Sequence, residues 1–349
     1  MFKNIILIFF LAILGAGLLG GLYFWNQVSL PVSSSEDELI FTIAEGQGVK
    51  EIAANLDEQG IIRSAWWFET YVFLDKSESK FIAGDYGLRK NMNIKEMVQA
   101  LTGGSPPSEE AITIKEGWKI ADIADYLQEK GVVTKEDFTA TALTTDTRNI
   151  IPDKQYTFLA DKPSDQGLEG FLFPDTYRIF KSTTSAEIIE RQLNNFGVKF
   201  TDQMVEDAAA DNMNIYQIVT LASILEKEIK IKRIKGQPIN NDLNVAAGVF
   251  YNRLNSGVAL QSDATVNYVT GGGDTQPSSS DIKVDSLYNT YKYKGLPPGP
   301  ICNPSIDAIK AAIYPEKTDY FYFLTKPDDT TVFSKTYEEH LQNKKKYLD

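Results

Sequence analysis

The chain has 349 residues, of which 43% are hydrophobic and 23% are charged, as in a globular protein with room for two or three domains. Its formal net charge is −12 and no run of lysine and arginine forms a basic stripe, which argues against a nucleic-acid partner. With one cysteine, Cys302, and one histidine, His340, it can build neither a Cys/His zinc site nor an internal disulfide. A catalytic triad would have to use His340, which fits a packing role better.

An apolar segment lies near the N-terminus, at residues 5–25. Its length, about 20 residues, predicts one helix across a bilayer core of roughly 30 Å. Lys3 precedes it and acidic residues 36–38 follow, so the positive-inside rule places the bulk of the chain outside the cytoplasm. We expect residues 1–30 to hold this anchor and the start of a linker that runs to residue 38. A cleaved signal peptide is the alternative, although the segment lacks a small-x-small cleavage pattern.

A sequence repeat with an offset of 71 residues follows. The run FTIAEG at 41–46 recurs as ITIKEG at 112–117, and each copy predicts a strand, a glycine turn and a helix closed by a glycine. Between the copies we expect a helix from Trp66, a strand at 81–88, a helix at 94–101 and a linker at 103–108. The pattern resembles the LysM-like module of cell-wall proteins, which we place at 38–105. A small α+β packing module without a ligand is the alternative.

The run NIYQIVTLASILEKEIK, residues 214–230, predicts an amphipathic helix. At about 100° per residue Glu226 falls roughly 20° from Ile215, within the apolar stripe, whereas Glu228 is expected to face solvent. A carboxyl group among apolar neighbours keeps its proton near neutral pH and can act as a general acid. The alternatives are a carboxylate at the rim of the stripe or one paired with a buried cation.

Several short runs farther along the chain are not explained by packing alone. They are LEGFLFPDTY (168–177), LASILEKE (221–228), VFYNRL (249–254), LQSDATV (260–266), YNTY (288–291), GLPPGPI (295–301), NP (303–304), DYFYFL (319–324), FSKT (333–336) and EH (339–340). Together and in this order they closely resemble the membrane-anchored endolytic murein transglycosylases, the MltG or YceG-like family. Ala264 and Leu287 stand where that family usually has proline, which bears on loop rigidity.

The resemblance implies an α+β fold with an N-terminal transmembrane helix, the small LysM-like module and a larger mixed α+β catalytic domain at 110–349. It also implies an endolytic lyase that cuts peptidoglycan glycan strands at the MurNAc-GlcNAc bond, leaves 1,6-anhydro-MurNAc ends and terminates strand elongation. Glu226 is the catalytic residue that it implies. No cofactor is expected; glycan strands, the cell (inner) membrane and peptidoglycan synthases are the expected partners.

This elimination needs one carboxyl group, which acts first as acid and then as base, and no second carboxylate to activate water. Polar side chains that could position the sugar come from three of the runs. These candidates are Asn252, Arg253, Gln261, Ser262, Asp263, Tyr288, Asn289 and Thr290. For Asn252 and Arg253 capping or ion pairing is the alternative, and Asp263 could simply cap a helix.

Two other functions fit the same sequence. A muramidase would hydrolyse the bond with Glu226 as acid and Asp263 as base. A membrane-tethered scaffold would bind peptidoglycan through the repeats and catalyse no reaction. Against it, a carboxylate among apolar neighbours costs folding free energy, which is not expected for a residue without a function.

Overall fold

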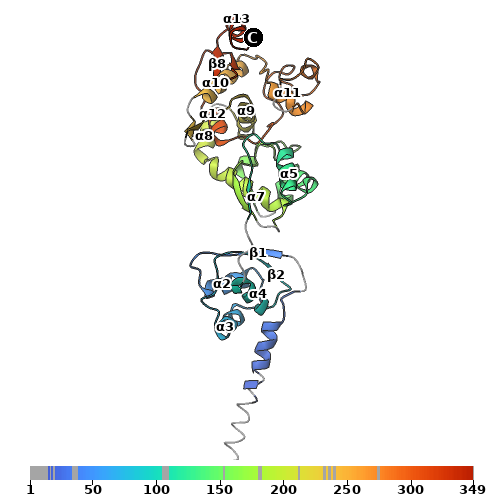
Figure 1. Cartoon of the computed structure of the whole chain (residues 1–349), viewed down its shortest axis with the longest axis vertical. Coiled ribbons are helices and arrows are strands. Elements are labelled where there is room, and N and C mark those ends of the chain that lie inside the picture. The colour runs from blue at the N-terminus through green and yellow to red at the C-terminus, as the bar shows by residue number, and fades with distance from the viewer. Residues whose placement is uncertain are drawn as a thin grey trace, which may run out of the picture. The chain divides into compact units, whose positions relative to one another are not determined.

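The structure, a computed structural model, describes residues 15, 17–18, 20–33, 38–103, 110–151, 154–179, 183–210, 213–230, 233–234, 237–238, 241–272 and 276–348. The chain forms two compact units, Met1–Glu110 and Ala111–Asp349, each built from helices and short strands (Figure 1). The expected mixed α+β class is therefore confirmed.

Most of the apolar segment at 5–25, and most of the linker expected at 103–108, lies outside the described residues. Among the residues that are described, no helix has the length and apolar character needed to cross a membrane. Residues 20–29 are helical, so the helix continues into the region where we expected a linker. Val28 near its end is buried in the core of the first unit.

The first unit follows the order strand, two helices, strand, helix. Its elements are β1 (Glu38–Ile43), α2 (Val49–Glu58), α3 (Ala65–Asp75), β2 (Gly84–Arg89) and α4 (Ile94–Gly103). β1 and β2 are antiparallel, with Phe41 opposite Tyr86, and both rings are buried against the helices. The predicted strand at 81–88 thus begins three residues later, and the predicted helix at 94–101 is confirmed.

The second unit opens with the same order of elements. β3 (Glu110–Thr113), α5 (Ile120–Glu129) and α6 (Lys135–Ala142) are followed by β4 (Thr176–Ile179), which pairs with β3. Gly46 and Gly117 occupy equivalent turns with φ of 82° and 74°, a left-handed conformation that favours glycine. The sequence repeat is therefore a repeat of structure. The sequence did not predict α6, and an insertion that carries η1 (Thr147–Asn149) and η2 (Thr157–Leu159) separates it from β4.

The rest of the second unit is mainly helical. Its elements are α7 (Ser185–Lys199), α8 (Asp202–Ala210), α9 (Ile215–Glu228), β5 (Arg233–Ile234), β6 (Gln237–Pro238), α10 (Asp242–Asn255), α11 (Asp263–Thr270), η3 (Asp281–Lys283), α12 (Ile306–Ile313), β7 (Tyr322–Thr325), β8 (Thr331–Ser334) and α13 (Tyr337–Tyr347). β5 pairs with β6, and β7 with β8, in antiparallel hairpins.

Helix α9 is the centre of this unit. It packs against α8, α10, α11 and α12, and every residue from Ile218 to Leu225 is buried (Figure 1). Asn214 begins the helix by accepting a hydrogen bond from the Gln217 N–H (2.8 Å), and the Gln217 side chain accepts one in return. Because α9 is buried on all sides, it does not have the single apolar stripe that the sequence predicted.

Candidate active site

The two glutamates at the end of α9 have different surroundings. Both are half-buried, since the helix leaves the core at this point. Glu228 lines the large cavity of the second unit, whereas Glu226 accepts hydrogen bonds at the start of α12. The expectation that Glu228 faces solvent is therefore wrong. The projection of the sequence at about 100° per residue assumed that one side of the helix faces solvent, whereas α9 is packed on all sides.

Glu228 is held at the cavity wall by the loop before α11. The Ser262 hydroxyl donates a hydrogen bond to its Oε1 atom (2.5 Å), and the Ala264 N–H also donates to the carboxyl group. Burial raises the pKa of Glu228 to about 7, and the nearby Asp263 adds to this, whereas the two hydrogen bonds and the Arg253 charge oppose it. Glu228 is thus poised to give up or take a proton near neutral pH.

Glu226 has a structural partner. Its Oε2 atom accepts hydrogen bonds from the backbone N–H (3.0 Å) and the hydroxyl (2.5 Å) of Ser305, the N-cap residue of α12. A carboxylate at a helix N-terminus is stabilised by the unpaired N–H groups and the helix dipole. Glu226 therefore ties α9 to α12, and it is absent from the residues that line the cavity.

The cavity has a volume of about 1320 Å³ and lies within the second unit. One wall is α5 and the turn before it, with Trp118, Asp122 and Tyr126. Other lining residues come from the end of α9, from residues 260–264, and from β7 and α13. Aromatic rings on the walls are those of Trp118, Tyr126, Phe250, Tyr268, Tyr291, Tyr322, Phe323 and Tyr337. Carboxyl, hydroxyl and aromatic groups thus converge on a space large enough for several sugar rings.

Three of the predicted contact residues, Gln261, Ser262 and Asp263, line this cavity. Gln261 has a left-handed backbone, with φ of 52°, which turns the chain into α11. Thr290 fixes the turn: its carbonyl accepts from the Gln261 N–H (3.1 Å) and its hydroxyl from the Ser262 N–H (3.0 Å). The Tyr291 hydroxyl donates to Asp263 (2.6 Å). Thr290 is buried and supports the site without lining it.

Arg253 also lines the cavity, but its guanidinium group forms hydrogen bonds with other groups of the protein. It donates to the carbonyl oxygens of Phe321 (2.6 Å) and Leu260 (2.7 Å) and lies over the Tyr322 ring. Asn252, its neighbour in α10, donates to the carbonyls of Thr318 and Tyr320 instead. Arg253 therefore places positive charge near Glu228, and Asn252 holds the segment before β7.

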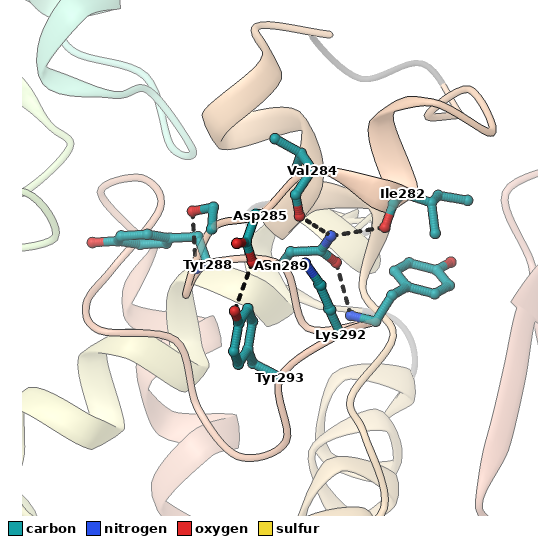
Figure 2. Close-up of polar contacts among 9 residues, drawn as sticks. Ile282, Val284, Asp285, Tyr288, Asn289, Lys292 and Tyr293 are labelled. Atoms are coloured by element: carbon teal, nitrogen blue, oxygen red, sulfur yellow. Dashed lines mark hydrogen bonds and ion pairs between the residues drawn. The ribbon is translucent and has the colours of Figure 1, made fainter.

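Asn289 holds its own loop together, and Tyr288 packs against α11. The buried Asn289 amide donates to the carbonyls of Ile282 (2.8 Å) and Val284 (2.9 Å), as Figure 2 shows. The Tyr288 ring packs against Tyr268 with centroids 5.0 Å apart. Neither residue lines the cavity. Of the predicted contact residues, Asn252, Tyr288, Asn289 and Thr290 thus lie outside the cavity lining.

The Asn303 side chain forms a hydrogen-bond network that the sequence did not predict. The Asn303 side chain accepts hydrogen bonds from the N–H groups of Gly170 and Leu172 (both 2.9 Å) and donates to the Trp118 carbonyl (3.0 Å) and to Glu169 (3.1 Å). Glu169 also accepts from the Ile120 N–H at the start of α5, and burial raises its pKa to about 8. The motifs at 168–177 and 303–304 thus fix the α5 wall of the cavity.

His340 and Cys302 do not form a nucleophile–base pair. His340 lies in α13 at the cavity wall, with its ring stacked on that of Tyr322 (centroids 5.5 Å apart), and burial lowers its pKa. The buried Cys302 thiol is directed to the carbonyl oxygen of Ser223 (3.3 Å). Both therefore act as packing residues.

Comparison with known proteins gives a consistent answer. The YceG-like family model matches residues 41–346. The chain is 33% identical over 337 residues to an endolytic murein transglycosylase of Bacillus subtilis, covering 95% of this chain and 91% of that protein. It is 32% identical to one of Streptococcus pneumoniae, of which it covers 63%.

A solved structure agrees with these sequence relatives. It is the crystal structure of a yceG-like protein of Listeria monocytogenes, with 32% identity, a TM-score of 0.58 and coverage of 88% of this chain and 100% of that chain. The chain belongs to the YceG-like family.

Proposed function

We propose that the chain is an endolytic murein transglycosylase and that Glu228 is its acid–base residue. The observation that carries the assignment is the Glu228 carboxyl group, which lies at the wall of the large cavity, bonded to Ser262, with a pKa of about 7. The names of the relatives in Bacillus and Streptococcus support the reaction. Glu226, which the sequence favoured, holds α12 in place.

The reaction needs one proton donor that becomes an acceptor. Protonated Glu228 gives its proton to the glycosidic oxygen between MurNAc and GlcNAc, and the bond from that oxygen to C1 of MurNAc breaks. The Glu228 carboxylate then takes the proton of the C6 hydroxyl while O6 bonds to C1. The products are a GlcNAc hydroxyl and a 1,6-anhydro-MurNAc end, and Glu228 is protonated again.

Other groups at the site support these steps. The Ser262 hydrogen bond orients the Glu228 carboxyl group. The aromatic rings of Trp118 and Tyr126, 5.2 Å apart, provide an apolar surface in the α5 wall on which the face of a sugar can pack. The reaction favours the C6 hydroxyl over water because the hydroxyl is already held beside C1.

The proposal also covers the location of the protein, its domains and its partners. The apolar segment at 5–25 supports a single-pass anchor in the cell membrane, with both units on the extracytoplasmic side. The βααβ order of the first unit supports a LysM-like module at 38–105 ahead of the catalytic domain at 110–349. An anchored enzyme would meet nascent strands at the membrane, beside peptidoglycan synthases, and would terminate their elongation.

The test is the chemistry of the new chain ends. The purified full-length protein is incubated with peptidoglycan strands, and fragments are analysed by mass spectrometry before and after borohydride reduction. We expect 1,6-anhydro ends that resist reduction and appear within strands. Reducible ends would instead support a muramidase, and no cleavage would support a scaffold.

A variant of Asp263 distinguishes elimination from hydrolysis, because this carboxylate lines the same cavity as Glu228, acts on it electrostatically and could activate water. We expect Asp263→Asn to weaken cleavage through lost positioning and to leave the anhydro product unchanged. If the variant stops the formation of reducible ends made by the unchanged protein, Asp263 is the base of a hydrolase.

A further inference from the structure

Helix α3 has an apolar outer face that the rest of its unit does not cover. Its inner residues Phe68 and Val72 are fully buried, yet Trp66, Phe73 and Leu74 are 60%, 68% and 61% exposed. We call these three residues the α3 apolar face. Trp66 and Phe73 are seven residues apart and thus lie on the same side of the helix, two turns from each other. Large exposed aromatic groups gathered on one side of a helix mark an interaction surface.

Polar groups contribute little to this face. Thr70 lies between Trp66 and Phe73, and its hydroxyl donates to the Trp66 carbonyl oxygen (2.7 Å). The charged residues of α3 are Glu69 and Asp75, both acidic. The face itself therefore attracts apolar partners, and the basic residue next to it, Lys76, follows α3 as its C-cap.

The face lies beside the aromatic end of the N-terminal helix. The ring of Trp67 contacts those of Tyr23 and Phe24, with centroids 5.7 Å away in each case, and that of Trp66 at 4.4 Å. Tyr23 and Trp25 are themselves 59% and 58% exposed. Figure 1 shows α3 at the end of the first unit where the N-terminal helix leaves it. The exposed aromatic residues of both elements form one continuous region.

The N-terminal helix is fixed to the first unit by packing and hydrogen bonds, so the position of α3 relative to this helix is fixed as well. Val28 is buried in the core of the unit. The Ser33 N–H donates to the Lys90 carbonyl (3.1 Å), and the Arg63 guanidinium to the Pro31 carbonyl (2.7 Å). The fold therefore fixes the position of α3 along the axis of the N-terminal helix, close to Tyr23 and Phe24.

We propose that the α3 apolar face inserts into the lipid interface of the membrane that holds the segment at 5–25; this rests on the proposed anchor. From residue 5 to Tyr23 a helix rises about 27 Å, close to the thickness of the hydrocarbon core. Tyr23 and Phe24 then lie at the interface, where tryptophan and tyrosine side chains are most stable, and α3 lies at the same level. The first unit thus lies on the membrane surface and does not hang from a flexible tether.

The test measures the depth of spin labels on the full-length protein in phosphatidylcholine vesicles. Labels are attached at Leu18→Cys, Phe73→Cys and Glu45→Cys, the last an exposed turn residue of the same unit. Cys302 is fully buried, and the protein without an added cysteine gives the background. We expect collisions of the label at 73 with a water-soluble nickel chelate to fall several-fold relative to the label at 45, and collisions with oxygen to rise. The neutral lipid suffices because the contact is apolar.

The label at 18 separates the two proposals. If it lies in the hydrocarbon while the label at 73 is as exposed to nickel as that at 45, the anchor is correct and the α3 inference is wrong. If neither label reaches lipid, both are wrong. Magnetic coupling between labels at 73 of different molecules would show that a second copy covers the face, which also overturns the lipid assignment. Anhydro-product formation, measured on the same preparations, tests the catalytic proposal independently.

Discussion

The Ser262 hydroxyl donates a hydrogen bond of 2.5 Å to Glu228, which joins the start of α11 to the end of α9. The bond holds the carboxyl group at the cavity wall and favours its ionised form, while burial favours its protonated form. The balance leaves the pKa of Glu228 at about 7. A residue that must act as acid and then as base works best with a pKa near the working pH.

The pH dependence of cleavage should report this group. Because the first step needs protonated Glu228, kcat/KM should be constant at low pH and fall as the pH rises through about 7. Above this value the decline should approach about tenfold per pH unit, as for loss of one proton. Initial rates of fragment release from soluble glycan strands at low substrate concentration measure the profile. A rate that rises through the same pH range would mean that the ionised form begins the reaction.

Ser262→Ala should move this profile. Loss of the hydroxyl removes a hydrogen bond that lowers the pKa of Glu228, so the decline in kcat/KM should begin at higher pH. Rates at low pH should change less. Thr265→Ala, which alters a neighbouring buried hydroxyl that donates to the Ser262 carbonyl, is the control for damage to the loop. A profile that keeps its position in Ser262→Ala would exclude the proposed coupling.

Ala264→Pro restores the residue that the family usually has at this position and removes a second donor to Glu228. Proline has no N–H, and it is tolerated in the first turn of a helix such as α11. Since the Ala264 N–H lowers the pKa of Glu228, the decline should again move to higher pH. The same profile measurement applies, with thermal unfolding as the check on folding. A shift to lower pH would contradict this role of the N–H.

Gly170→Ala should destabilise the second unit. Gly170 has a φ of 91°, and an added Cβ would lie within 2.8 Å of Pro300 and Val219. The left-handed conformation alone costs roughly 1–2 kcal/mol, and overpacking typically adds about 1–3 kcal/mol. Gly131→Ala, at a φ of 69° with open space around it, should show only the conformational cost. Urea unfolding of both variants measures the difference, and equal losses would refute close packing at Gly170.

The sequence was informative where local geometry determines structure. The repeat, its glycine turns and the helix α9 all follow from the spacing of apolar residues and glycines. Gln261, Ser262 and Asp263 were expected in a loop after an apolar segment; Gln261 lies in that loop, Ser262 is the N-cap and Asp263 the first residue of α11, and all three line the cavity.

The sequence misled where tertiary packing decides. A helical wheel assumes one buried side, but α9 is covered on all sides, so the wheel could not tell which glutamate faces the cavity. Ser305, which binds Glu226, is 79 residues away in sequence, and no local pattern relates the two. Asn252 and Asn289 were expected to bind sugar because amides can, yet the structure uses both to hold backbone carbonyls. The unpaired outer face of α3 likewise became visible only with the fold.

The most direct test of the central claim compares Glu228→Gln with Glu226→Gln. Each change keeps the shape of the side chain and removes its titrating proton, and thermal unfolding of both variants checks their folding. We expect Glu228→Gln to lower the rate of anhydro-end formation by about 10²–10⁴-fold while glycan binding persists. Glu226→Gln should retain most of the activity and lose stability through its weakened bonds to Ser305. Abolished cleavage in a well-folded Glu226→Gln, with an active Glu228→Gln, would contradict the account.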